Sequence, residues 1–152
     1  MPENVKFEPV SLQKMREFGM DYTKILVREL LRAGKTASGQ LVKSINYKLK
    51  EEAEGYQLVI ESEDYLKFVD EGRRRGTYPP IKPLLKWVSI RGMNKNAAYA
   101  IQKSIFKFGI KPTNVISRVV REFETNDTLK RKYEDEVVNN LIDMINKNYK
   151  EI

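Results

Sequence analysis

Apolar residues recur at steps of three and four near the start of the chain, which is the period of one helix face. This stripe consists of Leu12, Met15, Phe18, Tyr22, Ile25, Leu26 and Leu30. Ser11 stands where a helix N-cap is preferred, and Gly34 stands where a helix end is preferred. Gly19 lies inside the stripe, where glycine costs roughly 1 kcal/mol relative to alanine. The pattern predicts a helix that ends near Gly34 and packs closely against another element at Gly19.

The pattern then changes from a helical period to strict alternation. Apolar and polar residues alternate over residues 45–50 and again over 56–61, and Glu54-Gly55 separates the two runs. A period of two over both runs predicts paired antiparallel strands joined by a tight turn. Lysines before the turn and glutamates after it suit cross-strand charge pairing. Residues 5–7 predict one further edge strand.

Helical spacing returns in the middle of the chain. Acidic residues 63–64 favour the first turn of a short helix that ends at Gly72. Pro83 predicts the start of a second helix, which Gly92 ends. A third helix is predicted over residues 97–108, where Gly109 and Pro112 follow the last apolar position of the stripe.

The last third of the chain predicts two more elements. Residues 115–123 indicate a short helix, with a strand as the alternative because the run is rich in β-branched residues. Asp127 is expected to cap a long C-terminal helix. The sum is an α+β fold, in which a hairpin and one or two further strands form a small antiparallel sheet packed against several helices. The predicted organisation is a single domain, 1–152, with an N-terminal segment 1–10, a core 11–123 and a C-terminal helix 127–152.

Charge is unevenly distributed along the chain. Residues 72–121 contain no Asp or Glu and have a net charge of +12, whereas the rest of the chain has 16 basic and 21 acidic residues, a net of −5. Such asymmetry can steer association with an anionic partner without identifying it. Nucleic acid, an acidic protein surface and the acidic part of an identical subunit would all fit.

Cysteine and histidine are both absent from the 152 residues. Their absence excludes disulfides, thiol catalysis, thiolate zinc sites and histidine-dependent general-base catalysis in this chain. No apolar run approaches the roughly 20 residues that span a bilayer, and the N-terminus lacks the apolar centre of a signal peptide. We therefore expect a protein made in the cytoplasm, without a membrane partner, a metal or another cofactor.

The segment FVDEGRRRGTYPP, residues 68–80, has the most unusual composition. It could bind phosphate, form an active site or contact another protein. Neighbouring residues on a helix do not face the same way, so Asp70 and Glu71 make a poor pair of metal ligands. We therefore expect no enzymatic activity. Arginine suits phosphate and carboxylate equally well, so the three arginines leave recognition of either group open.

Two recognition hypotheses follow for this basic region. The first is a subunit or adjacent-ring interface formed by Asp70, Glu71, Arg73, Arg74, Arg75 and Tyr78. The second is contact with DNA or an acidic partner through Arg73, Arg74, Arg75, Lys82, Lys86, Arg91 and Lys95. Tyr78, Trp87 and Tyr99 could stack on bases. The spacing of Trp87 with its apolar neighbours favours a core position instead.

The order of these features resembles the head–tail connector, neck and tail-completion proteins of tailed bacteriophages. Four ordered segments between residues 11 and 123 carry the resemblance after the N-terminal helix. They are SGQLVKSI (38–45), YLKFVDEGR (65–73), IKPLLKWVSIRG (81–92) and GIKPTNVI (109–116). The chain departs from the family pattern at Glu71, at the arginine triplet and at Val115, positions expected to affect contacts with neighbours more than the fold.

The resemblance implies a non-enzymatic virion protein. Such proteins assemble as rings, commonly hexamers or dodecamers, at the portal–tail junction, where they complete or seal the DNA channel. The implied partners are identical subunits, portal or adaptor proteins and tail proteins, and the implied location is the virion. Non-specific nucleic-acid binding through residues 72–121 is the alternative, and contact with passing viral DNA is compatible with both hypotheses.

Overall fold

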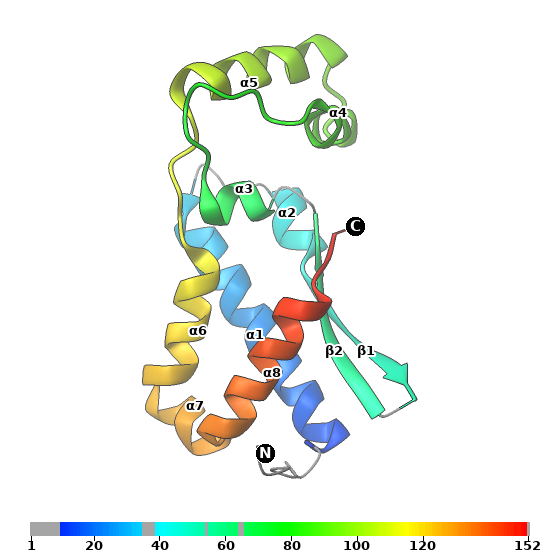
Figure 1. Ribbon diagram of the computed structural model, residues 1–152, viewed down its shortest axis with the longest axis vertical. Coiled ribbons are helices and arrows are strands. Elements are labelled where there is room, and N and C mark those ends of the chain that lie inside the picture. The colour runs from blue at the N-terminus through cyan, green and yellow to red at the C-terminus, as the bar shows by residue number, and fades with distance from the viewer. Residues whose placement is uncertain (1–9, 35–38, 54, 64–65, 152) are drawn as a thin grey trace, which may run out of the picture.

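The computed structural model describes residues 10–34, 39–53, 55–63 and 66–151. In chain order the elements are α1 (Leu12–Arg32), α2 (Gly39–Ser44), β1 (Asn46–Glu52), β2 (Gly55–Ser62), α3 (Leu66–Glu71), α4 (Ile81–Ile90), α5 (Lys95–Phe108), α6 (Val115–Thr125), α7 (Asp127–Lys132), α8 (Asp135–Asn148) and β3 (Lys150–Glu151). The fold is α+β, as the sequence predicts (Figure 1). Among the described residues, no helix combines the length and the apolar character needed to cross a membrane.

The first predicted helix is confirmed as α1. The Ser11 hydroxyl accepts a hydrogen bond from the Lys14 amide (3.1 Å), which satisfies one of the free N–H groups of the first turn. Gly19 faces the sheet, and a Cβ atom there would lie only 2.7 Å from the Tyr47 ring. The predicted close packing at Gly19 is therefore confirmed, since no larger residue fits between this helix and the strand.

The predicted hairpin is also confirmed. β1 pairs antiparallel with β2, and Lys48 forms a cross-strand ion pair with the buried Glu61 (Nζ–Oε1 3.0 Å). The third strand, β3, pairs parallel with the end of β2 through Lys150 and Glu151, so the prediction that the further strand is antiparallel is wrong. β3 lies at the C-terminal end of the described chain; the strand predicted at residues 5–7 lies outside the described residues.

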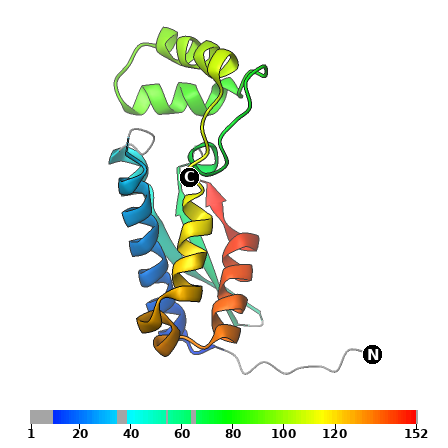
Figure 2. The same cartoon turned by 90° about the vertical axis from the view of Figure 1, so that its left-hand side faces the viewer.

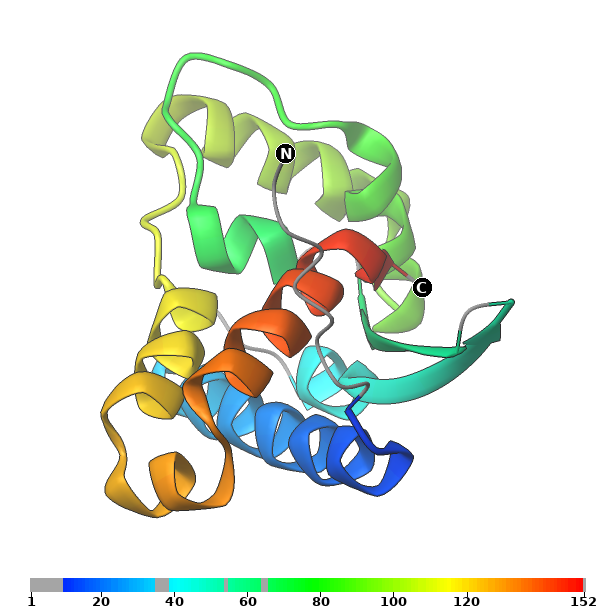
Figure 3. The same ribbon diagram turned by 60° about the horizontal axis from the view of Figure 1, so that its bottom comes forward.

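The main core lies where α1, α6 and α8 meet the sheet. Helices α1 and α8 pack against the strands, and α6 packs against both helices (Figures 1 and 2). Figure 3 shows α8 between α6 and the β-hairpin. At the centre, the rings of Phe18 and Phe123 are stacked with centroids 4.4 Å apart, and Tyr133 meets Phe18 edge-on at 5.2 Å. We call this part of the structure the body, residues 10–71 and 112–151 where described.

The C-terminal region differs from the single helix predicted over residues 127–152. Helix α7 ends at Lys132, Tyr133 is extended, and α8 begins at Asp135. The Tyr133 side chain is buried against the aromatic core, and its hydroxyl donates a hydrogen bond to Asp21 (2.6 Å). Burying this ring moves Tyr133 out of helical geometry. The cap of α7 is also not the predicted Asp127, because the side chain of Asn126 accepts from the Leu129 amide.

Residues 72–111 project from the body as a separate unit, which we call the helical arm. It contains α4 and α5 and lies at the top of Figure 1, away from most of the sheet. Both predicted helices are confirmed, although α4 begins at Ile81, two residues before Pro83. Residues 115–123 lie within helix α6. The predicted helix is therefore confirmed there, and the alternative of a strand is wrong.

Candidate functional site

The helical arm has its own small apolar cluster. Leu84 and Val88 of α4 and Ala98 of α5 are buried together, and Trp87 packs partly against them. The core position predicted for Trp87 is therefore confirmed. The Arg91 guanidinium lies over the Trp87 ring, 4.2 Å from its centroid, so this ring is not a bare platform for a nucleotide base.

The arm also exposes large apolar side chains. Of eight such residues among the described residues, five lie on the arm: Tyr78, Ile90, Met93, Tyr99 and Phe108. Phe108 is 72% exposed and Tyr99 is 54% exposed. The Tyr78 ring stacks on Phe106 at 4.2 Å, so its exposed position is fixed. Concentration of exposed apolar groups on one unit is typical of a surface that meets a partner.

The same unit is strongly basic. Residues 72–111 contain no Asp or Glu, and their basic residues are Arg73, Arg74, Arg75, Lys82, Lys86, Arg91, Lys95, Lys103, Lys107 and Lys111. The arm thus has a net charge of +10, and the remaining 18 basic and 21 acidic residues give −3. The structure places this positive charge in one projecting unit, where it can steer encounters with an acidic surface.

Two neighbouring chain segments attach the arm to the body. Arg73 and Ile110 exchange backbone hydrogen bonds of 2.9 and 2.8 Å, which form an antiparallel bridge. Gly72 and Gly109 both have positive φ, and a Cβ atom on either would collide with the backbone of the opposite segment. Gly72 and Gly109 therefore allow the two backbones to approach closely, and the attachment of the arm to the body is narrow and tightly packed.

The three predicted interface arginines have different surroundings. Arg73 donates to the Tyr78 carbonyl oxygen (3.3 Å) and lies over the Phe68 ring, so it holds the arm's own loop. Arg74 and Arg75 are exposed. Within the described ranges, none of the three forms an ion pair with a carboxylate. Pairing of these arginines with carboxylates of another subunit remains a prediction.

The two predicted interface carboxylates also differ. Asp70 Oδ1 accepts a hydrogen bond from the Ile116 amide (3.0 Å), so it caps the first turn of α6 from the end of α3. Burial raises the pKa of the Asp70 carboxyl above its usual value; the Ile116 hydrogen bond lowers it, and the nearby Glu71 charge raises it. Glu71 is exposed. Asp70 therefore has a structural role that sequence reasoning missed, whereas Glu71 is open to a partner.

The remaining residues of the DNA-contact hypothesis lie on or beside α4. Lys86 forms an ion pair with Glu63 (3.7 Å), which ties α4 to the end of β2. Lys82 and Lys95 are exposed and have no carboxylate within ion-pair distance among the described residues. Of the residues in the DNA-contact hypothesis, these two lysines, Arg74 and Arg75 are the ones available to an anionic partner.

A cavity of about 380 Å³ is lined by residues of α1, β2, α3, α6 and α8, and Figure 1 shows how these elements are arranged. Tyr22, Ile60, Leu66 and Ile145 form its buried apolar lining, while Asp70, Glu71, Lys67 and Asn146 are among the polar residues beside them. The Tyr22 side chain, with its hydroxyl, is 2% exposed. Burial, helped by the Asp70 charge, raises the pKa of this hydroxyl, so it stays protonated and available as a donor.

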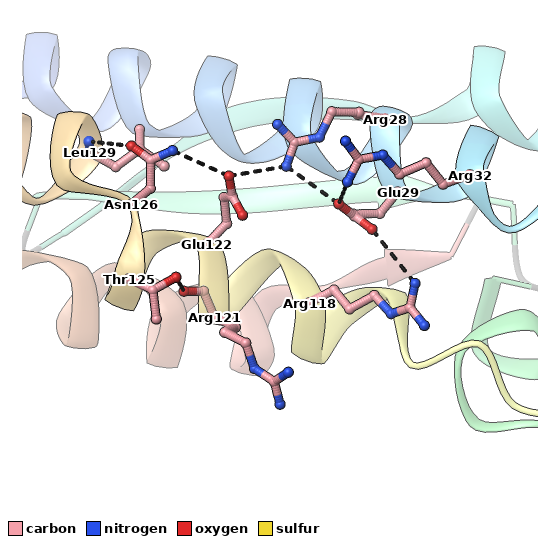
Figure 4. Close-up of polar contacts among 9 residues, drawn as sticks. All are labelled: Arg28, Glu29, Arg32, Arg118, Arg121, Glu122, Thr125, Asn126 and Leu129. Carbon is pink, nitrogen blue, oxygen red and sulfur yellow. Dashed lines mark hydrogen bonds and ion pairs between the residues drawn. The ribbon is translucent and has the colours of Figure 1, made fainter.

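A second polar cluster joins α1 to α6 (Figure 4). Glu29 is 5% exposed, and its carboxylate meets Arg28 (3.3 Å), Arg32 (3.2 Å) and Arg118 (3.9 Å). Arg28 also pairs with Glu122 at 3.2 Å. Sequence reasoning missed this cluster, although Glu29 lies seven residues after Tyr22, at a position of the apolar helix face. The arrangement neutralises a buried carboxylate and holds two helices together.

The helical arm and the cavity differ in the groups that they present. Within the described ranges, no group of three or more acidic residues is arranged to hold a metal ion. The arm presents cations and apolar side chains, and the cavity presents two acidic residues, a tyrosine and apolar walls. Comparison with protein-family models, curated proteins and solved structures gives no match to this chain.

Proposed function

We propose that this protein is a structural component of a tailed-bacteriophage particle, which assembles as a ring at the head–tail junction and helps to complete the DNA channel. The ordered resemblance over residues 11–123 supports this proposal. In this role the protein is not an enzyme, and its partners are identical subunits together with portal, adaptor or tail proteins.

The observation that carries the proposal is the helical arm. It adds little to the main core, has a cluster of only three buried apolar residues, and exposes five large apolar side chains beside ten cations. A folded chain gains stability by burying such groups, so leaving them exposed on a narrow attachment favours burial against another molecule.

The charges of the two parts favour contact between copies. The helical arm has a net charge of +10 and the rest of the chain has a net charge of −3. The arm of one subunit is therefore attracted to the body of the next. A contact between two unlike surfaces repeats from subunit to subunit and closes into a ring when the rotation between subunits permits. Electrostatic attraction and apolar burial therefore act in the same direction.

The direct test is mass spectrometry of purified phage particles, followed by electron microscopy with a labelled chain. We expect the chain in mature particles and the label at the head–tail junction. Particles that lack the chain contradict the proposal.

Self-association supplies a second test with matched variants. The double variant Tyr99→Ser/Phe108→Ser removes exposed apolar side chains from the arm, and Met20→Ser/Leu31→Ser removes exposed ones from the body. We expect the arm variant to weaken association at least about tenfold, because buried aromatic residues dominate many interfaces. The body variant should change it by less than about twofold. Equal effects would exclude the arm as the main contact.

Non-specific DNA binding is the second candidate function, and the acid-free helical arm favours it. Each phosphate contact adds about 0.9 to the log–log slope of affinity against salt on duplex DNA. Lys82→Gln/Lys95→Gln should lower that slope by about 2, whereas Lys130→Gln/Arg131→Gln on α7 should leave it unchanged. Fluorescence anisotropy with a labelled duplex measures the slope, and no binding at low salt eliminates this function.

A further inference from the structure

The turn between α4 and α5 forms a rigid, exposed knob. Gly92 N donates to Ser89 O (3.0 Å) and Met93 N donates to Val88 O (2.8 Å), the paired bonds of a Schellman motif. Gly92 has φ of 67°, as that motif requires. Ile90 and Met93 are 41% and 44% exposed at this turn. Little conformational entropy would be lost on burying a turn that is already ordered.

The knob is amphipathic. Arg91 and Lys95 are exposed beside the two apolar side chains and give the turn a charge of +2. Its natural counterpart is a depression with apolar walls and an acidic edge.

The cavity lined by Tyr22 and Asp70 has those properties. Its walls include Leu66, Ile116 and Ile145, and Asp70 and Glu71 supply two carboxylates against the single ammonium of Lys67. Its volume of about 380 Å³ is within the range of binding pockets, roughly 300–1,000 Å³. One or two side chains would fill it.

Two polar groups that line the cavity, on Tyr22 and Asp70, are suited to contact an incoming segment. The Tyr22 side chain is 2% exposed and lines the cavity, and its protonated hydroxyl can donate to an acceptor that enters there. The Asp70 carboxylate is partly buried, and this burial raises its pKa. Among the described residues it forms no ion pair. An incoming basic turn provides both partners, because its cations pair with Asp70 and its backbone carbonyl oxygens accept from the Tyr22 hydroxyl.

The knob and the cavity lie on different sides of one molecule. In Figure 2 the α4–α5 turn lies on the side of α1, whereas α8, which forms one wall of the cavity, lies on the opposite side. Residues 89–95 of the turn are not among the residues that line this cavity in the same chain. Contact between the two surfaces requires two copies and is a contact between unlike faces.

We infer that the α4–α5 turn of one copy inserts into the Tyr22–Asp70 cavity of the next copy. Met93, whose flexible side chain fills irregular spaces, enters the apolar part of the cavity. Arg91 and Lys95 face Asp70 and Glu71 at its edge. This inference rests on the proposed function, because it identifies the surfaces by which the ring subunits join.

Disulfide trapping tests the contact directly, because the chain contains no cysteine of its own. A Met93→Cys protein is mixed at high concentration with an Asn146→Cys protein of different tag length, since Asn146 lines the cavity and is exposed. The control replaces Met93→Cys with Ser104→Cys, an exposed position on α5 outside the turn. We expect cross-linking between the two proteins about tenfold faster with Met93→Cys, because contact raises the effective concentration of the thiols.

Charge variants at the edge of the cavity give an opposed pair of results. Glu71→Lys should weaken self-association and Lys67→Glu should strengthen it, each by about three- to tenfold, since the incoming turn is basic. Lys24→Glu, exposed on α1 outside the cavity, should change the affinity by less than about twofold. Sedimentation velocity measures all three without a requirement for complete rings.

The outcomes separate this inference from the proposed function. If particles contain the chain but Met93→Cys cross-links no faster than Ser104→Cys, the inserted turn is wrong and the structural role stands. If particles lack the chain, the proposed function fails whatever the cross-linking shows. No cross-link at any concentration, or the same direction of change for Glu71→Lys and Lys67→Glu, also overturns the insertion.

Discussion

The body and the helical arm of this protein use their apolar residues in opposite ways. The body buries Phe18, Phe123 and Tyr133 in one aromatic centre beneath three helices and a sheet. The arm fully buries only Leu84, Val88 and Ala98 in its cluster and leaves five large apolar side chains exposed. The difference indicates that the body supplies stability while the arm supplies contact surface.

This contrast can be measured because the single tryptophan lies on the arm. Trp87 packs against the small cluster of α4 and α5, so its fluorescence reports the arm. Circular dichroism in the far ultraviolet reports mostly the helices of the body. Regions with few buried apolar contacts open at lower free energy than the main core. The two signals should therefore respond differently to substitutions in the two parts.

The largest effect is expected from Phe18→Ala at the centre of the body. Phe18 is fully buried and stacked on Phe123, so its removal should lower the free energy of unfolding by about 3–5 kcal/mol. Both signals should shift together in urea, because the arm's cluster is too small to stay folded without the body. Met20→Ala, 58% exposed on the same helix, should change the midpoint little. A Trp87 signal that stays unchanged in Phe18→Ala would show an independently stable arm.

Leu84→Ala should destabilise the arm alone. It removes a large part of the arm's cluster and should cost about 2 kcal/mol, the lower end for a leucine at a site that is 8% exposed. The Trp87 fluorescence midpoint should move to lower urea while the dichroism midpoint stays within error. Lys82→Ala, on the exposed face of α4, should move neither. Equal shifts of both signals would mean that arm and body unfold as one unit.

Gly109→Ala and Gly92→Ala separate the attachment of the arm from the conformation of its turn. Both glycines have positive φ, which costs about 1–2 kcal/mol for alanine. A Cβ atom at Gly92 meets nothing within 4 Å, whereas at Gly109 it would collide with the Arg73 backbone. Gly109→Ala should therefore cost more and should speed hydrogen exchange at the Arg73 and Ile110 amides. Similar exchange in the two variants would contradict a tightly packed attachment.

The smallest effect is expected at Asp70, where the body meets the arm. Its folded-state pKa is raised, so the charged form is less favourable in the folded state, and wild-type stability falls as pH rises through that pKa. Asp70→Asn keeps an oxygen to accept from the Ile116 amide and removes the charge. It should match wild type at pH values below the ordinary aspartate pKa and unfold at a slightly higher temperature at pH 7. Calorimetry at the two pH values tests this, and a variant less stable at pH 7 would show that the charge stabilises the fold.

Local pattern predicts most of the helices and the hairpin because each has an apolar face of its own period. The stripe through Phe18 and Tyr22 predicts α1, and alternation predicts both long strands. The break between α7 and α8 at Tyr133 cannot be predicted from the apolar pattern, because a tyrosine at this position fits the helical period of its neighbours. The Tyr133 ring turns inward to the aromatic centre, where it meets Phe123, ten positions earlier, and Phe18, more than a hundred positions earlier.

The candidate site was predictable to a smaller extent. Acid-free composition indicates the basic surface, and the glycines near the arginines indicate an unusual backbone. The cavity, however, is assembled from α1, β2, α3, α6 and the C-terminal end of α8, so no single stretch of sequence describes it. The inward role of Asp70 depends in the same way on α6, whose first turn lies 46 residues further along the chain.

The bridge between Arg73 and Ile110 makes the helical arm a removable insertion. Its two ends are already paired like the last residues of a β-hairpin, so a two-residue turn could join them and leave the body's chain path intact. Arms of other lengths or charges could be exchanged at the same point without repacking the aromatic centre. The contact surface and the scaffold of this chain are therefore joined at one pair of neighbouring segments, and each can be altered separately.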